Sequence, residues 1–254
     1  MYATARRPET LGDLEAAGCR TLALDVSDEA SMADAVATIE RESGAVGVLV
    51  NNAGYGQQGP VEEVSVDAMR RQLETNVLGP VRLTQLVLSG MRSQGWGRIV
   101  NISSVGGRLT FPGGGAYHAS KHAMEALSDA LRHEVRGFGV RVVLVEPGLI
   151  RTRFGDTATA TIAEEAEAAG PYAAFDTALA RRVTETYERP SRLTSVGPEA
   201  VARVIERAIS RTRPRPRYVV TGAARMLLGI RALLPDAAWD AFLRTQFPTP
   251  RPEA

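Results

Sequence analysis

The segment Tyr117-His118-Ala119-Ser120-Lys121 holds a phenol and an ammonium group four positions apart. On a helix, residues at this spacing project from the same face and can reach one reacting centre. A lysine cation near a phenol favours the phenolate, so we expect Lys121 to lower the pKa of Tyr117 toward working pH. Tyr117 is therefore a candidate general acid and base. The same pair also occurs on ordinary helix surfaces, so the surrounding sequence has to decide between the two interpretations.

Polar residues follow three of the strands that the sequence predicts. Residues 101–106 bring hydroxyl groups to a strand end, residues 50–54 bring two amides and a glycine, and residues 146–152 follow a third strand. Ligands of open α/β folds bind at the carboxyl ends of such strands, where Ser104 could hydrogen-bond a substrate oxygen. Asn76 lies inside a predicted long helix, where its propensity is poor and a special role is expected.

The elements that would position these side chains alternate along the chain. Short runs rich in Val, Leu and Ile predict buried strands at 21–26, 46–50, 98–102, 140–145 and 217–221. Helical periodicity lies between them, at 29–42, 66–91, 116–136 and 198–211. Strand alternating with helix predicts an α/β fold with a doubly wound parallel sheet, and 254 residues fit a single domain.

Taken together, these motifs resemble the classical short-chain dehydrogenase/reductase family, from residue 1 to about residue 247. The resemblance implies a Rossmann-like fold in which Asn76, Ser104, Tyr117 and Lys121 form a catalytic tetrad. Ser104, rather than Ser103, fits the family's spacing to the tyrosine. The opening residues 2–6, the segment 128–132 and the long lid are similar to the 17β-hydroxysteroid and retinol dehydrogenase branch, which implies a small lipophilic alcohol, ketone or aldehyde as substrate.

The resemblance also implies a set of residues that bind a nicotinamide dinucleotide. Tyr117 and Lys121 would contact it, and Asp25 and Val26 would flank the adenine. The other implied cofactor-binding residues are Asn52, Ala53 and Gly54 after one strand, and Pro147, Gly148, Ile150 and Thr152 after another.

The residues after the first strand bear on the choice of cofactor. An acidic residue at this strand end would accept hydrogen bonds from a ribose hydroxyl and repel a phosphate. This chain instead has Ala5 there, followed by Arg6 and Arg7. Guanidinium groups suit a phosphate dianion, which favours NADP(H) over NAD(H). A solvated basic turn with no ligand is the alternative.

The first residues, 1–5, resemble a strand already running into a turn, with no glycine-rich strand-turn-helix unit before them. In this fold that unit holds the cofactor pyrophosphate. We expect a natural protein about 30 residues longer, the size of one such unit. The alternative is a non-catalytic chain that cannot bind the dinucleotide and acts, if at all, as a partner-dependent binding module. Either way, we expect strand 1–5 not to pair directly with strand 46–50.

Residues 151–196 interrupt the strand-helix rhythm and predict an inserted substrate lid, whereas the proline-rich residues 248–254 predict a disordered tail. Residues 226–247 are amphipathic and are expected to pack over the substrate pocket or a partner subunit; the alternative is that they lie on a membrane surface.

Composition excludes several classes of function. The formal net charge is +1, which argues against a nucleic-acid partner. No apolar run approaches the ~20 residues that a transmembrane segment needs. Cys19 is the only cysteine and no signal-like segment precedes it, so the expected location is cytoplasmic. His118 and His122 lack the neighbours of a zinc pair, so no metal is expected. The resemblance implies a homodimer or homotetramer.

Overall fold

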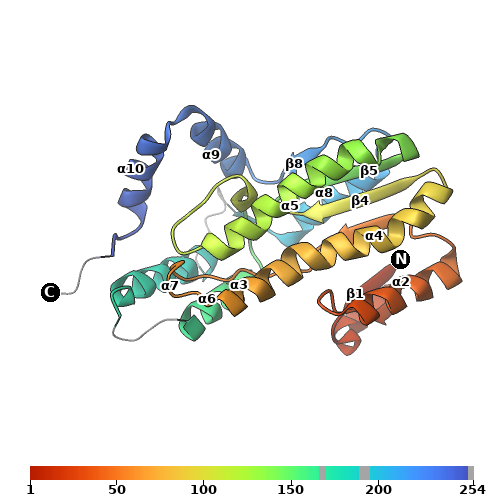
Figure 1. Ribbon diagram of the computed structural model, residues 1–254, viewed down its shortest axis with the longest axis horizontal. Coiled ribbons are helices and arrows are strands. Elements are labelled where there is room, and N and C mark those ends of the chain that lie inside the picture. The colour runs from red at the N-terminus through yellow and green to blue at the C-terminus, as the bar shows by residue number, and fades with distance from the viewer. Residues whose placement is uncertain (166–169, 189–194, 251–254) are drawn as a thin grey trace.

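Four parallel strands form the central sheet, in the order β3 (Val48–Asn51), β4 (Gly97–Ile102), β5 (Val140–Glu146) and β8 (Arg217–Val219) (Figure 1). The computed structural model describes residues 1–165, 170–188 and 195–250. Nearly every residue of β4 and β5 is buried, because helices cover both faces of these strands. The predicted apolar runs thus coincide with strands to within a few residues.

Successive side chains of β5 point into different helical layers, as the pleat of a strand requires. Val142 packs with Met91 of α4 (Gly79–Ser93), whereas Val143 packs with Ala208 of α8 (Pro198–Ser210). Helix α5 (Gly115–Glu134) lies beside α4 on the same face (Figure 1). The short turns η3 (Val105–Gly107) and η4 (Arg136–Phe138) flank α5 in the chain. This arrangement confirms the predicted single-domain, doubly wound α/β fold.

The long helix predicted at 66–91 is present but is not uniform. It consists of α3 (Val66–Leu73), a π-helical turn η2 (Glu74–Leu78) and α4. Ser65 caps its start by accepting a hydrogen bond from the amide of Ala68. Single π turns inside α-helices occur often at functional sites, and this one contains Asn76.

A second, two-stranded parallel sheet is formed by β1 (Tyr2–Ala5) and β2 (Arg20–Ala23). The turn η1 (Pro8–Leu11) and the short helix α1 (Gly12–Ala16) connect these strands. Helix α2 (Glu29–Ser43) follows, and its start is capped by the Asp28 carboxylate, which accepts from two backbone amides.

Strands β1 and β3 belong to different sheets. Among the described residues, β1 pairs with β2 alone and β3 pairs with β4 alone. This agrees with the expectation that the two strands do not pair directly. The strand-turn-helix unit expected between them stays a prediction.

The predicted lid segment is mainly helical. It contains α6 (Phe154–Glu165) and α7 (Ala173–Glu188), and residues 166–169 and 189–194 lie outside the described residues. The sequence showed no strand-like run here, but Ser195–Val196 forms β7, which pairs with β6 (Leu149–Ile150). Two-residue strands carry no recognisable alternation, which is why the pattern missed them.

The chain ends in α9 (Gly222–Leu233) and α10 (Asp236–Gln246). Leu228 and Trp239 pack against Leu109, so this region lies over the loop that follows β4. Of the expected disordered tail, residues 248–250 form neither helix nor strand, and residues 251–254 lie outside the described residues.

Candidate active site

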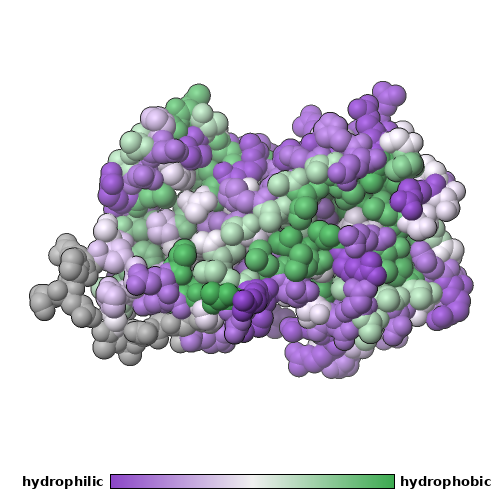
Figure 2. Space-filling view, viewed as in Figure 1, coloured by the Kyte–Doolittle hydropathy of each residue, from purple (hydrophilic) through white to green (hydrophobic). Residues whose placement is uncertain are grey.

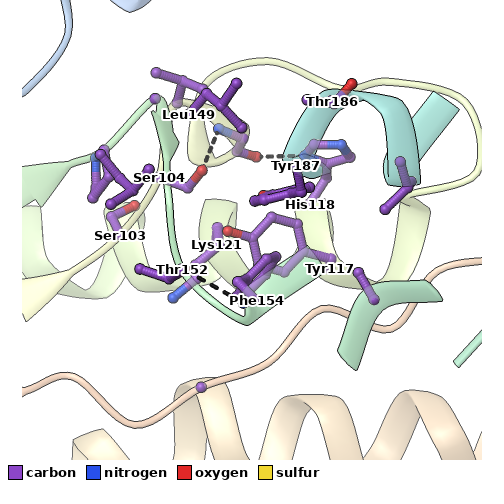
Figure 3. A pocket seen from close by; sticks show the side chains of 18 of the residues that line it. Ser103, Ser104, Tyr117, His118, Lys121, Leu149, Thr152, Phe154, Thr186 and Tyr187 are labelled. Carbon is purple, nitrogen blue, oxygen red and sulfur yellow. Dashed lines mark hydrogen bonds between the residues drawn. The ribbon is translucent and has the colours of Figure 1, made fainter. Parts of the chain in front are cut away.

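Tyr117 lies in the first turn of α5 and lines a cavity of about 600 Å³ at the carboxyl ends of β3, β4 and β5. Its ring packs against the rings of Phe154 and His118, at 5.6 Å between centroids in both cases. Figure 3 shows Tyr117, Ser104 and Lys121 gathered in this cavity with Phe154 beside the tyrosine ring. The side chains predicted to carry the chemistry are therefore brought together.

Ser104 precedes η3 and faces Tyr117. Its Oγ accepts a hydrogen bond from the amide of Gly106 at 3.0 Å, which leaves its hydroxyl proton free to be donated. Burial raises the pKa of Tyr117 above its ordinary value, and a hydrogen bond with Ser104 partly opposes this rise. Ser103 is 3 % exposed, and its hydroxyl lies near the Glu125 carboxylate, whose pKa it lowers. Of the two serines, Ser104 thus lies beside the tyrosine.

Lys121 follows Tyr117 by one helical turn and is buried. Its Nζ donates a hydrogen bond to the carbonyl of Ile102 at 2.8 Å and lies 5.9 Å from the centroid of the Tyr117 ring. Burial lowers the pKa of Lys121 to about 8, and the nearby Glu125 carboxylate offsets part of this shift.

The expectation that Lys121 lowers the pKa of Tyr117 is not met in the structure. We expected a lowered pKa of Tyr117, yet its pKa is raised, because burial of the phenol is the largest cause. The ammonium group of Lys121 is directed to the Ile102 carbonyl, and its charge is not among the causes of the shift.

Asn76 lies in the π turn and holds the loop after β3. Its side-chain amide donates to the carbonyl of Tyr55 at 2.9 Å, and its Oδ1 accepts from the amide of Tyr55 at 3.2 Å. It also donates to Ser120 Oγ at 3.1 Å, which joins the loop to α5. A Cβ atom on Gly54 would lie 2.9 Å from Asn76 Oδ1, so the close approach of this loop requires a glycine.

Most of the expected nicotinamide-side residues line the same cavity as Tyr117. They are Asn52, Gly54, Pro147, Gly148, Ile150 and Thr152. Ala53 and Asn76 are not among the lining residues, although both adjoin residues that are. Because Gly54 has no side chain, a nicotinamide ring or ribose could lie close to the backbone there. The cation of Lys121 could hydrogen-bond the ribose of a nucleotide bound here.

The expected adenine-side residues lie on the other sheet. Arg6 and Arg7 follow β1, while Asp25 and Val26 follow β2, and none of the four lines the cavity. Asp25 accepts hydrogen bonds from the amide and the hydroxyl of Ser27, which lower its pKa, and the charge of Arg6 lowers it further. The structure therefore brings Arg6 close to Asp25, at a distance from the tyrosine.

The walls of the cavity include aromatic residues that the motifs did not reveal. Phe154, Tyr187, Phe111 and Phe247 come from α6, α7, the loop after η3 and the residue after α10. Burial raises the pKa of Tyr187, and the nearby Tyr117 raises it further, so this second phenol stays protonated. Aromatic residues in the otherwise Ala-rich and Thr-rich segment 151–196 were the signal that could have found two of them.

The two histidines of α5 form local contacts. His118 Nδ1 lies 2.9 Å from the carbonyl of Gly106, and His122 Nδ1 lies 2.9 Å from the carbonyl of His118. Within the described residues, no group of three or more potential metal ligands was found. None of the helices formed by the described residues is long and apolar enough to cross a membrane.

Comparison with known proteins decides the family. A sequence model of the family described as short chain dehydrogenase matches residues 2–163, which is more than half of the chain. The chain belongs to the short-chain dehydrogenase family. The oxidoreductase YbbO of Escherichia coli K12 is 34 % identical over 96 % of this chain and 84 % of its own length. An NADPH-dependent 3-dehydrocapnine reductase of Ornithobacterium rhinotracheale is 36 % identical, covering 87 % of this chain and 77 % of its own.

Solved structures agree with this short-chain dehydrogenase assignment. A short-chain dehydrogenase from Streptomyces avermitilis has a TM-score of 0.75 and 34 % identity, covering 96 % of this chain and 89 % of that one. One from Burkholderia phymatum, solved with NAD, has a TM-score of 0.74 and 26 % identity, with coverages of 97 % and 84 %. Serine dehydrogenase solved with NADP⁺ has a TM-score of 0.71 and 27 % identity, with coverages of 86 % and 83 %. Both nicotinamide dinucleotides thus occur among the structural neighbours of this oxidoreductase.

Proposed function

We propose that this oxidoreductase uses NADP(H) to interconvert a lipophilic secondary alcohol and its ketone, or an aldehyde. The observation that carries the proposal is the position of Tyr117 beside Ser104, at the inner end of an apolar cavity. A phenol and a hydroxyl that face the same space can both reach one carbonyl oxygen.

The side chains then have separate roles. When bound, the cofactor supplies or accepts the hydride. In the reducing direction, Tyr117 donates its proton to the carbonyl oxygen, and its raised pKa keeps that proton in place at neutral pH. Ser104 donates a hydrogen bond to the same oxygen, because its own Oγ is already an acceptor for Gly106.

Lys121 and Asn76 support this pair. The ammonium group of Lys121 lies near the tyrosine and near Gly54, where it can hold a ribose hydroxyl. Asn76 fixes the backbone of Tyr55, and we propose that it takes part in a water relay that returns a proton to the site.

The preference for NADP(H) rests on Arg6 and Arg7. Both are exposed on the turn after β1, and no acidic residue replaces Ala5 at the strand end. The relative from Ornithobacterium rhinotracheale, described as NADPH-dependent, supports this choice. The structural neighbour from Burkholderia phymatum was solved with NAD, so the preference for NADP(H) needs an experimental test.

The direct test of the proposal is Tyr117→Phe in the natural full-length protein. We expect kcat/KM for ketone reduction to fall by about 10²–10⁴-fold while NADPH binding, measured by calorimetry, is unchanged. Tyr172→Phe is the matched control, because that exposed phenol donates only to Glu62. Substantial turnover by Tyr117→Phe would remove the tyrosine as proton donor.

The serine assignment has its own test. Ser104→Ala should lower kcat by about 10²–10³-fold, as expected for loss of one donor to the developing oxyanion. Ser103→Ala is the control, and a larger loss there would show that the wrong serine was chosen.

Cofactor choice is tested by replacing Arg6 and Arg7 together with Ala. The affinity for NADP(H) should fall far more than that for NAD(H), since only the former presents a phosphate at this position. Arg41→Ala is the control, because that side chain contacts Thr38 on α2. Equal losses for both cofactors would argue for a role in folding. Failure of the natural protein to bind either cofactor would favour the non-catalytic alternative.

Assembly as a homodimer or homotetramer and a cytoplasmic location are also part of the proposal. Figure 2 shows apolar side chains gathered over α4 and α5. Leu78 of η2 and Leu127 of α5 are 52 % and 43 % exposed. Such a strip supports contact with a second copy. Sedimentation at several protein concentrations would measure the assembly.

A further inference from the structure

The lining of the cavity has an unusual charge distribution. Lys121 and Arg182 are the charged side chains among its described lining residues, and no Asp or Glu accompanies them. Lys121 lies at the inner end with Tyr117. Arg182 is exposed, so it lies where the cavity opens to solvent. The cavity therefore has a cation at each end and no anionic side chain within the described lining to balance either one.

Arg182 is held in position by the end of the chain. Its Nη1 donates to the carbonyl of Gln246 and its Nη2 to Gln246 Oε1, both at 3.0 Å. The guanidinium lies 4.7 Å from the centroid of the Phe247 ring. Among the described residues no carboxylate forms an ion pair with it. Since a guanidinium carries five N–H groups, donors remain for a ligand.

A row of rings connects the two ends. Centroids are 5.6 Å apart from Tyr117 to His118, 5.7 Å from His118 to Phe111 and 6.4 Å from Phe111 to Phe247, which lies beneath Arg182. Tyr187, which also lines the cavity, follows Arg182 by five residues of α7, about 7–8 Å along the helix at ~1.5 Å per residue. The space between catalytic tyrosine and arginine is thus lined by apolar surface.

We infer that the substrate is an apolar chain with an anionic head group, whose carbonyl reaches Tyr117 while its carboxylate, sulfonate or phosphate pairs with Arg182. The inference rests on the proposed function for the position of the carbonyl. The planar, pre-positioned fork of Arg182 matches the oxygens of such a group, and the aromatic row accommodates the chain. Neutral lipophilic ketones could not form the ion pair with Arg182 and would bind less tightly.

The neighbouring residue on α7 supplies a matched control. Arg181 is paired with Glu185 across one helical turn at 3.9 Å, and it is not among the cavity-lining residues. Arg181→Gln and Arg182→Gln remove the same charge from adjacent positions of one helix. They differ in whether the charge faces the cavity.

The test measures binding by calorimetry, so that it does not depend on turnover. The probes are decanoate, 1-decanesulfonate and 1-decanol, which share one alkyl chain, titrated into the natural full-length protein and both variants. We expect the two anions to bind at least about tenfold more tightly than the alcohol. Arg182→Gln should abolish that difference and leave the affinity for 1-decanol unchanged, while Arg181→Gln should preserve it.

Two outcomes would overturn the inference. One is equal binding of anions and alcohol by the unmodified protein, and the other is an equal loss in both variants, which would reflect general charge. Reduction of a long-chain oxo acid and its methyl ester, measured in parallel, separates this inference from the proposed function. Turnover of both substrates without preference for the acid would contradict the head-group contact alone. Absence of turnover with retained anion selectivity would contradict the catalytic proposal alone.

Discussion

The central sheet and the two-stranded sheet differ in how far their strands are buried. Nearly all residues of β4 and β5 are buried, whereas no residue of β1 or β2 is. Tyr117, Ser104 and Lys121 are positioned by the first sheet, and Arg6, Arg7 and Asp25 by the second. The residues proposed to transfer the proton are therefore supported by the more deeply buried sheet, and the residues expected to bind the adenosine phosphate by the less buried one.

The link between the two regions is one layer of helix packing. Met32 and Val36 of α2 pack with Leu83 and Val87 of α4 in a shared core cluster. At the surface, Arg82 forms an ion pair with Glu29. Pairs of exposed strands alone are marginal, so this layer must supply most of the stability of the β1–β2 sheet.

The largest expected difference between the regions is in amide hydrogen exchange. Amides of β4 and β5 should exchange on the order of 10³-fold more slowly than those of β1 and β2, because the latter open locally without global unfolding. Mass spectrometry of peptides that cover residues 2–23 and 97–146 measures this. Equal protection would mean that the two sheets unfold as one unit.

The next largest effect is expected from Arg217→Met. Arg217 Nε lies 3.1 Å from Glu125 Oε2 and 3.0 Å from Glu146 Oε1, and Glu146 is completely buried. Removing the cation leaves the buried Glu125 without its ion pair and Glu146 with Arg108 alone, which should lower the free energy of unfolding by about 3 kcal/mol. Urea denaturation measures it. A loss below the error of the measurement would show that these carboxylates are protonated or hydrated in the folded state.

Lys121→Met should change stability in the opposite direction. Burial lowers the pKa of Lys121 from 10.5 to about 8, so keeping the side chain protonated at pH 7 destabilises the folded protein. At pH 7 the variant should therefore be more stable by about 1–3 kcal/mol, although inactive. The unfolded chain binds the proton more tightly between pH 8 and 10.5, so stability of the unmodified protein rises over that range. The gain measured by urea denaturation should shrink accordingly from pH 7 to pH 10, and a gain independent of pH would contradict burial as its cause.

The smallest effect is expected from Arg20→Met in β2. Arg20 pairs with Glu42 and Tyr2, but the two charged groups are exposed and water screens them. The urea midpoint should move little, in contrast with Arg217→Met. A comparable shift for both variants would mean that the two-stranded sheet depends on its surface pairs.

The sequence predicted the elements of the fold because their signals are local. Runs of Val, Leu and Ile marked the strands, and periodicity marked the helices to within a few residues. The π turn at Asn76 was not predicted, because its partner Tyr55 lies 21 residues away and joins it only in the folded protein. The side chain was nevertheless singled out, since asparagine inside a helix is locally unfavourable.

The candidate site likewise has features that local motifs predict and features that depend on distant contacts. Tyr117, Ser104 and Lys121 belong to short motifs after a strand, so their proximity could be predicted from topology. The raised pKa of Tyr117 could not, because it follows from burial by Phe154 and the helices around it. The position of Arg182 depends on Gln246 and Phe247 at the far end of the chain, a contact that no local pattern encodes.

Lys121 is also the only lysine in the 254 residues, all other basic side chains being Arg or His. With a pKa of about 8, its amine is largely unprotonated in mildly alkaline buffer, whereas ordinary lysines are not. Within these residues Lys121 therefore supplies the one side-chain amine for an acylating reagent, inside the candidate site. An amine-directed reporter would label this cavity without any engineered residue, and the extent of labelling would report whether a ligand covers Lys121.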